Sequence, residues 1–586
     1  MPPASHKTAL FRNRYNVIHQ RLLRNEAFQS SAVASTKGPP ALMRSSSSGL
    51  TSQHTHKITP IANLLGRHGS HHMLLGLLSI LPTGNLAISD LTGTISLDLR
   101  QAVAMPEDSA WFTPGMIVLV DGVYEEEEES AGKTLGGGSG VGGIVGGRFQ
   151  GFFVGQPPCE KRGATLGISG PDGGPDHTIG GGFGWIDFLG VGSERASGAR
   201  MRKLEQRILH SQRQLQSQPQ SINAGAVAAA ANPPSRGRIV IVGELNLDEP
   251  RALAALRRIL TEYDTEPEGR SPMAFVLAGS FARRAVMAGG EGGGSVEYKE
   301  HFDALASVLS DFPALLRSAA FVFVPSDNDG WASAFGAGAA VPLPRRPVPD
   351  LFTSRVRRAF ANANAEVPKA GEEGGGASGG GAGGEAIWTS NPARVSVFGP
   401  AHEIVLFRDD MAARMRRHSV RLKGSSASAG DEEDAAAEGE EQPPAATAED
   451  AMDVDHHESR EDGGSSNTAK PANGTATATP LLPHDVRTAR RLVKTVLDQG
   501  YLAPFRDAVR PVLWDRGSAM HLYPLPTAAA LIDATAPPFC LTYEGCHVMN
   551  PGAVLVAGAA GGRGGGVGRW VEYELGKGGR VRECVF

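Results

Sequence analysis

The sequence has few cysteines, few aromatic residues and no long apolar run. Only four of its 586 residues are cysteines, no two of them form a Cys-x-x-Cys pair, and aromatic residues make up 6% of the chain. So few cysteines exclude a disulfide-built fold and indicate a reducing compartment. No apolar run approaches the roughly 20 residues that a membrane-spanning helix needs, and the first residues include no apolar signal segment. We therefore expect an intracellular protein that contacts no membrane.

Metal-ligand spacing is also lacking. Cys540, Cys546 and His547 lie close together in the sequence, but no second ligand pair follows them. A structural zinc ion needs four ligands, so this group is better explained as ordinary thiols and an imidazole. We expect no structural zinc.

Glycine and proline, by contrast, are abundant, at 75 and 39 residues. The segment 423–475 carries 14 acidic residues against three basic ones and almost no aliphatic residues. A segment of that composition cannot build a core. We expect disordered insertions at 361–386 and 423–478, and a loop expansion at 125–147.

Short strands are predicted between residues 58 and 160. Turn signals separate five apolar runs of the spacing that suits a small Greek-key barrel of the OB type. The runs are 73–80, 86–89, 95–99, 116–120 and 149–154. These runs contain few aromatic residues apart from Phe149, Phe152 and Phe153 in the last run. Because a single-strand-binding barrel needs a stacking platform, this scarcity favours a structural or protein-binding barrel over a DNA-binding one.

The chain divides into four regions. A short amphipathic helix, with Tyr15, Ile18 and Leu22 on one face, and a flexible segment occupy 1–54. An OB-fold is predicted at 55–160, a glycine-rich linker with a helix at 161–235, and an α/β domain with the two disordered insertions at 236–586.

Three strand-to-loop junctions in the last region carry the candidate site. The stretches 239–246, 274–280 and 321–329 each begin with a short apolar run and end at Gly or Pro and a polar cluster. This pattern is typical of parallel strands that are buried on both faces and deliver their loops to a crevice. The layout resembles a calcineurin-like metallophosphoesterase, a fold with two layered sheets. The former metal-site positions would be Glu244, Asn246, Ser280, Asp327, Asn328 and Asp329.

The residues at these positions do not suit a pair of metal ions. Two divalent ions need a bridging carboxylate together with imidazole or carboxylate ligands. Ser280 cannot bridge, and Asn246 and Asn328 stand where the resemblance implies imidazoles. We therefore expect a degenerate site with no catalytic residue, no metal and no cofactor. The rival reading is a live metal-dependent phosphoesterase that uses the oxygen ligands Glu244, Asn246, Asp327 and Asp329.

An OB barrel followed by an inactive phosphoesterase is the arrangement of the B subunits of replicative DNA polymerases. Within that family the chain resembles the epsilon group, because an ordered set of stretches matches across most of its length. They are 14–28, 90–99, 318–325, 389–394, 403–410, 493–504 and 521–526. The small subunit of DNA polymerase delta is the near alternative, disfavoured by 403–410 and 493–504.

The resemblance implies a noncatalytic scaffold in chromosomal DNA replication, located in the nucleus. Such a subunit holds the C-terminal region of the catalytic subunit of DNA polymerase epsilon and links it to the replicative helicase complex, with DNA reached through the complex. The resemblance does not identify the partner-binding residues. Relatives in animals and fungi carry a small helical domain before the helix that starts near Arg14, and almost nothing precedes that helix here. Either the lineage lacks that domain or the gene model is truncated. If the domain is missing, the helicase contacts that it makes would have to come from elsewhere. A structural Asn-Pro-Gly turn is implied at 550–552.

Overall fold

The structure is a computed structural model that describes twelve stretches of the chain. They are 2–28, 56–107, 109–126, 144–165, 237–266, 271–285, 294–330, 341–365, 384–397, 402–423, 483–556 and 566–586. The predicted linker beyond residue 165, the 366–383 part of one predicted insertion and the acidic insertion beyond residue 423 lie outside them. Within these stretches no helix is long and apolar enough to cross a membrane.

The N-terminal strands form a closed barrel. Their order is β3-β2-β1-β5-β6, and a further pairing between β3 and β6 closes the ring. All five runs predicted from the sequence form strands, and the closed ring agrees with the predicted barrel. A sixth strand, β4, extends the sheet beside β6 and is too short for a sequence pattern to reveal. The strands are β1 (His71–Ile80), β2 (Leu86–Ser89), β3 (Thr94–Asp98), β4 (Val103–Met105), β5 (Ile117–Glu125) and β6 (Ile144–Gly155).

Strands also occupy both ends of the predicted loop expansion at 125–147. β5 continues to Glu125, and β6 already begins at Ile144. Arg148 and Glu125 pair across these two strands, with 2.7 Å between the guanidinium Nε and the carboxylate. The described part of the expansion therefore extends the barrel sheet.

The first helix, α1 (Ala4–Arg24), begins ten residues before the predicted start at Arg14. Its predicted apolar face is present: Tyr15, Ile18 and Leu22 pack against Leu75 and Ile117 of the barrel. The added turns carry Leu10, which packs against the apolar core that the barrel shares with the rest of the molecule. From Leu10 onward, α1 is therefore part of the packed structure.

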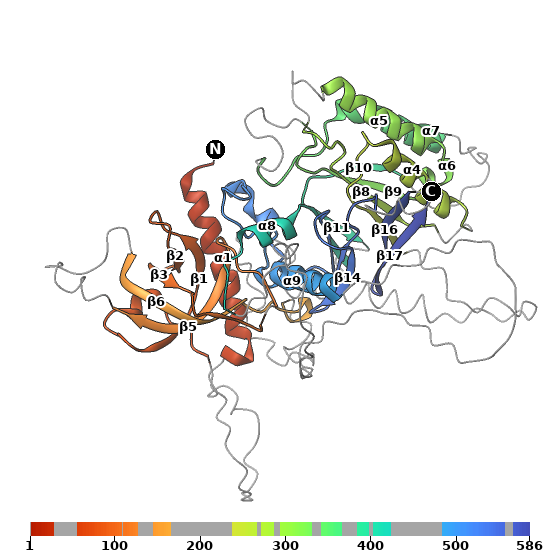
Figure 1. The fold of residues 1–586 in the computed structure, drawn as a ribbon. Helices are drawn as coiled ribbons and strands as arrows, with labels where there is room; N and C mark the ends of the chain where they lie inside the picture. The colour runs from red at the N-terminus through yellow and green to blue at the C-terminus, as the bar shows by residue number, and fades with distance from the viewer. Residues whose placement is uncertain are drawn as a thin grey trace, which may run out of the picture.

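The C-terminal region is a sandwich of two sheets (Figure 1). In the first sheet the order is β10-β9-β8-β7-β16-β17, and in the second it is β11-β12-β13-β15-β14. Apolar side chains from the facing surfaces of both sheets form one buried cluster between them. The strands are β7 (Arg238–Val242), β8 (Ala274–Ala278), β9 (Ala320–Val324), β10 (Ala386–Trp388), β11 (Ala393–Val397), β12 (His402–Arg408), β13 (Ala528–Ile532), β14 (Phe539–Tyr543), β15 (Cys546–Asn550), β16 (Val567–Glu574) and β17 (Gly578–Val585).

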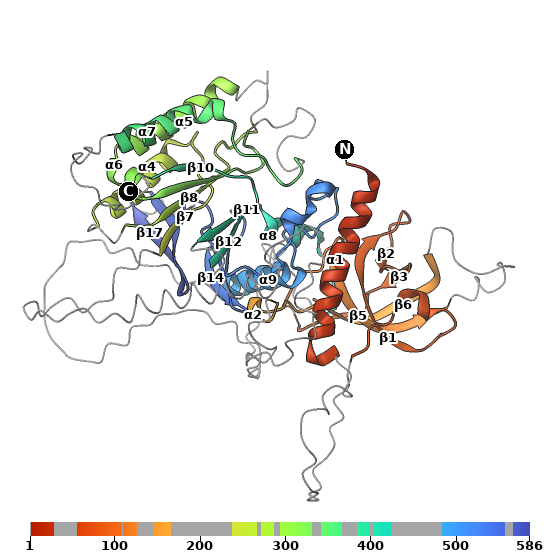
Figure 2. The ribbon, with the colours of Figure 1, turned by 180° about the vertical axis from the view of Figure 1, so that it is seen from behind.

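Helices cover the outer face of each sheet. One group packs on the first sheet through a second apolar cluster, and the other lies between the second sheet and the barrel (Figure 2). The first group is α4 (Pro250–Asp264), α5 (Ser295–Ser310), α6 (Pro313–Ser318) and α7 (Asp350–Ala365); the second is α8 (Met411–His418) and α9 (Pro483–Gln499). Shorter turns are α2 (Arg162–Thr165), η1 (Glu26–Phe28), η3 (Ile61–Leu64) and η9 (Trp514–Met520).

The helix α7 and the strand β10 shorten one predicted insertion. The segment 361–386 was expected to be disordered throughout, but α7 continues to Ala365 and β10 begins at Ala386. α7 extends that far because Phe360 and Ala363 continue its buried face.

The barrel and the sandwich share one apolar core. Trp111 and Phe112 of the barrel region belong to the same buried cluster as Met415 of α8 and Val496 of α9. The main-chain N–H of Trp111 donates to the hydroxyl of Thr495 at 3.0 Å. The two parts are therefore joined by buried, specific packing.

Candidate functional site

The candidate site lies where parallel strands of both sheets end. β7, β8 and β9 run parallel in the first sheet, and β12, β13 and β15 run parallel in the second. Loops that follow parallel strands gather at one edge of a sheet. The predicted positions follow the first three strands, and the second sheet adds Arg408–Asp410, Asp533 and Asn550.

Arg408, at the end of β12, connects the two sheets. Its side chain is 2% exposed. Nε donates to the carbonyl of Gly279 at 2.9 Å, Nη1 donates to Asp410 at 2.6 Å, and Nη2 lies 3.3 Å from a carboxylate oxygen of Glu244. Burial acts to lower the pKa of Arg408, but Asp410 and Glu244 raise it above its ordinary value. A permanently charged guanidinium therefore occupies the space between the β7, β8 and β12 loops.

A second guanidinium holds Asp327. Arg510 is fully buried, and its two terminal nitrogens donate to the two oxygens of Asp327 at 2.9 and 2.7 Å. The same side chain lies 3.3 Å from Asp409. Arg414 also contacts both carboxylates, at 3.4 Å from Asp327 and 3.1 Å from Asp409. Two arginines thus neutralise two carboxylates in a closed network.

Asp329, which lies in the loop after β9, has a structural role. Its carboxylate accepts hydrogen bonds from the N–H of Phe281 at 2.9 Å, the N–H of Ser326 at 2.8 Å and the hydroxyl of Tyr298 at 3.1 Å. Burial raises the pKa of Asp329 to about 6. A Cβ atom on Gly279 would lie 2.1 Å from an Asp329 oxygen, so glycine is required there. The carboxylate therefore holds the β8 and β9 loops together.

The remaining predicted positions are less closely connected. Asn328 donates to the carbonyl of Arg283 at 2.9 Å, while Ser280 is buried at 5% exposure. The side-chain oxygen of Asn246 is buried and has no hydrogen-bond partner among the described residues. The structure thus brings Glu244, Asp327 and the Gly279-Ser280 loop around arginines.

The loop after β15 closes the other side of the site. The side-chain oxygen of Asn550 accepts from the N–H of Asp533 at 3.0 Å and from the N–H of Gly552 at 2.9 Å. A Cβ atom on Gly243 would lie 1.8 Å from the carbonyl oxygen of Gly552, so this turn packs directly on the loop after β7. The Asn-Pro-Gly turn is held by its own hydrogen bonds, as a structural turn requires.

Neither the arginines of this site nor Asp409 and Asp410 are among the positions predicted from the sequence. Arg408, Asp409 and Asp410 follow an apolar run that ends in a polar cluster, the same signal that identified the first three junctions. Arg510 lies on a loop and has no such signal. Among the described residues, no three His, Cys, Asp or Glu side chains group in a way that could hold a metal ion. The arrangement can neutralise charge and fix loops.

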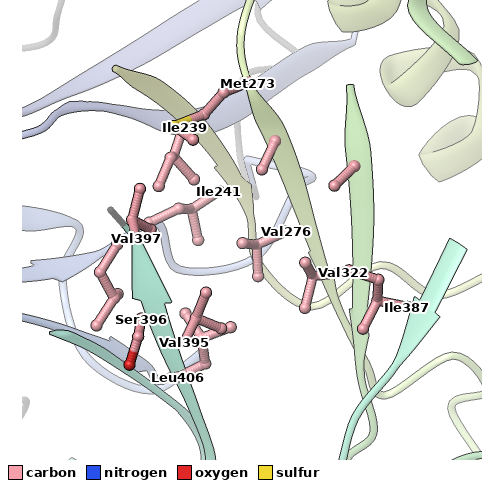
Figure 3. A pocket seen from close by; sticks show the side chains of 13 residues that line it. Ile239, Ile241, Met273, Val276, Val322, Ile387, Val395, Ser396, Val397 and Leu406 are labelled. Atoms are coloured by element: carbon pink, nitrogen blue, oxygen red, sulfur yellow. The ribbon is translucent and has the colours of Figure 1, made fainter. Parts of the chain in front are cut away.

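An apolar cavity lies apart from these loops, between the two sheets (Figure 3). Its volume is about 260 Å³. Aliphatic residues such as Ile239, Val276 and Leu406 line it, and Ser396 is its one polar lining side chain. A catalytic pocket needs convergent polar groups, so this cavity is a packing feature of the sandwich.

Comparisons with known proteins match both parts of the chain. Residues 4–158 match the family model described as "DNA polymerase epsilon subunit 2-like, OB-fold domain". Residues 239–541, more than half of the chain, match the model that describes the B subunit of DNA polymerase alpha/epsilon.

Individual relatives carry corresponding names. The B subunit of DNA polymerase epsilon from Saccharomyces cerevisiae is 29% identical over 566 residues, which cover 95% of this chain and 66% of the relative. Its counterpart in Schizosaccharomyces pombe is 28% identical over 95% of this chain and 68% of the relative. DNA polymerase epsilon subunit 2 of Mus musculus is 24% identical over 95% of this chain and 73% of the relative. The chain thus spans about two thirds of the length of the fungal relatives. With more than half of its residues matched, the chain belongs to the family of DNA polymerase alpha/epsilon B subunits.

Proposed function

We propose that this chain is a noncatalytic accessory subunit of nuclear DNA polymerase epsilon that acts as a scaffold for the C-terminal region of the catalytic subunit in chromosomal DNA replication. The observation that carries the proposal is the pairing of Arg408 and Arg510 with carboxylates at the strand ends. The relatives named above are polymerase epsilon subunits, which supports the choice of polymerase. A link to the replicative helicase complex and contact with DNA through the complex belong to the same proposal.

In this proposal the sandwich is an inactive relative of the metallophosphoesterases. Its two facing sheets, with helices outside and loops gathered after parallel strands, support that relationship. A metal pair would need free carboxylates, yet Glu244 contacts Arg408 and Asp327 contacts Arg510 and Arg414. Guanidinium groups take the place of the cations, so the loops stay folded without metal.

The barrel offers an apolar surface for a partner. Phe153 on β6 lies opposite Val103 on β4, and Met105 follows two residues later on the same outward side. Phe153 is 45% exposed and Met105 is 55% exposed. Exposed aromatic and methionine side chains are enriched at the centres of protein interfaces. We assign this β4–β6 patch to the contact with the catalytic subunit.

Co-expression with the C-terminal region of the polymerase catalytic subunit tests the scaffold. The expected result is a one-to-one complex that persists in about 1 M NaCl, because ions do not screen apolar burial. Phe153→Asp should weaken the complex at least about tenfold, as loss of a central interface residue does. Leu351→Asp is the matched control, since Leu351 is 61% exposed on α7. A soluble monomer that never co-purifies with the catalytic subunit would refute the proposal.

Metal titration tests the rival enzyme. The purified protein should neither bind stoichiometric Mn²⁺ nor hydrolyse a phosphodiester, because arginines hold the available carboxylates. Hydrolysis that depends on Mn²⁺ and disappears on Ser280→Ala would establish a live phosphoesterase.

A further inference from the structure

A basic surface lies at the junction of the barrel and the sandwich. The last turn of α8 exposes Arg416, Arg417 and His418. The chain then crosses to the barrel, where the N–H of Val420 donates to the carbonyl of Phe112 at 2.8 Å and the N–H of Lys423 donates to that of Ala102 at 2.9 Å. Together with a nearby loop residue these side chains form what we call the α8 basic surface: Arg416, Arg417, His418, Arg421, Lys423 and Arg506.

Positive charges crowd this surface without nearby compensation. Burial and then the charges of Arg417, Arg414 and Arg506 lower the pKa of His418, so Arg506 lies close enough to α8 to act on it. Within the described stretches, no ion pair with a carboxylate involves any of the four arginines of this surface, which are Arg416, Arg417, Arg421 and Arg506. The acidic neighbour of Arg506, Asp507, pairs instead with Lys7 at 2.7 Å. Such a surface attracts a polyanion.

The chain supplies a polyanion at the end of this surface. Immediately after Lys423 the sequence enters the segment 424–482, with 14 acidic residues against Arg460 and Lys470, and it returns to described structure at Pro483, where α9 begins. All 14 acidic residues lie between 431 and 462. The first of them is eight residues from Lys423, and eight residues span at most about 28 Å.

We propose that the α8 basic surface binds the chain's own acidic segment, 431–462. Single ion pairs between exposed side chains contribute little. A short tether, however, raises the local concentration of the segment to the order of millimolar, so a weak multivalent contact is populated within one molecule. The contact is electrostatic and adds nothing to the apolar core.

Zero-length cross-linking of the full-length protein tests the contact. A carbodiimide joins carboxylates to amines, so Arg416→Lys, Arg417→Lys and Arg421→Lys make the surface reactive while keeping its charge. The matched control is Arg355→Lys, Arg357→Lys and Arg358→Lys on the exposed face of α7. We expect links from positions 416, 417 and 421 to carboxylates of 431–462, at least about tenfold more frequent than from the α7 positions, and lost in about 1 M NaCl, where the Debye length falls to about 3 Å.

Four results would overturn the proposal. Links as frequent from α7 as from α8, or links that survive high salt, would show that the contact is not specific or not electrostatic. Links between isotopically distinct copies in a mixture would show that the segment of another molecule is bound. A single-stranded oligonucleotide is the competing polyanion: if it binds the native chain at α8 as tightly as a chain with all 14 carboxylates changed to amides, the segment does not occupy the surface.

Discussion

Buried arginines stabilise two regions of this molecule, with charged partners in one region and neutral partners in the other. At the strand ends, Arg408 and Arg510 bind carboxylates. Between α1, the barrel and the sandwich, Arg14 donates to the carbonyl of Gly115 at 3.0 Å, and Arg21 donates to the carbonyls of Pro157 and Asp498. The difference appears in the pKa values of Arg408 and Arg14.

Carboxylate neighbours raise the pKa of Arg408 against the effect of burial, whereas burial lowers the pKa of Arg14. Removing an arginine that neutralises buried carboxylates leaves those carboxylates buried without their partner charge. Arg14 donates to one main-chain carbonyl and lies 4.3 Å from the centroid of the Tyr501 ring, so its removal leaves only neutral groups behind. The comparison therefore predicts that the strand-end arginines are the more costly to remove.

The largest effect is expected from Arg510→Met. This change leaves Asp327 and Asp409 with fewer positive charges in a buried site, and breaking a buried ion pair typically costs about 3–5 kcal/mol. Denaturant unfolding of the purified protein measures the loss. Adding Asp327→Asn should recover more than half of it, because the unpaired charge is then gone. A single variant as stable as the parent would show that the network does not support the loops.

Asp329→Asn tests how the stability of the strand ends depends on pH. Because burial raises the pKa of Asp329 to about 6, its protonated form favours the folded state; this contribution is fully present below about pH 4 and is lost as pH rises through about 6. The stability of the parent relative to the variant should therefore fall by up to about 3 kcal/mol between these values. Unfolding measured across that range gives the difference. The control is Asp264→Asn, an exposed position on α4, for which the stability difference from the parent should vary less with pH. An equal pH dependence for the two variants would contradict the role given to Asp329.

Arg14→Met addresses the junction. It removes one hydrogen bond to a main-chain carbonyl and one contact with an aromatic ring, together worth about 1–3 kcal/mol. The expected loss of unfolding free energy is smaller than for Arg510→Met, and that order is what the comparison requires. A larger loss at the junction would reverse it.

Much of the fold was predictable, and the parts that were not share a cause. The strands β7, β8 and β9 are buried on both faces, and the barrel strands are bounded by turn residues, so local sequence contains their signal. The pairing of Asp327 with Arg510 joins residues 183 positions apart. No local pattern specifies such a contact, so the polar positions after these strands could be read from the sequence, but the arginines that pair with them could not.

The start of α1 shows the same limit on a smaller scale. The face formed by Tyr15, Ile18 and Leu22 has helical spacing, which predicted the second half of the helix. The first half packs against distant elements: a Cβ atom on Gly517 would lie 2.4 Å from Leu10, and Lys7 pairs with Asp507. Because these contacts come from the far end of the sequence, the N-terminal boundary of α1 depends on tertiary structure.

The smallest effect is expected from deleting 424–475. Neither region compared above includes this segment, and its composition provides almost no apolar surface to bury. If it contacts only the α8 basic surface, exposed ion pairs are all that the deletion removes, and each contributes about 0–1 kcal/mol at physiological salt. The thermal midpoint of the deleted chain should therefore stay within a few degrees of the parent, and the small remaining difference should vanish at high salt. A chain in which 424–475 is replaced by a Gly/Ser linker of equal length separates loss of charge from loss of length. A fall of many degrees in both variants would show that the segment packs into the core. The conclusion that buried arginines stabilise the strand ends and the junction while the acidic segment stays at the surface would then be wrong.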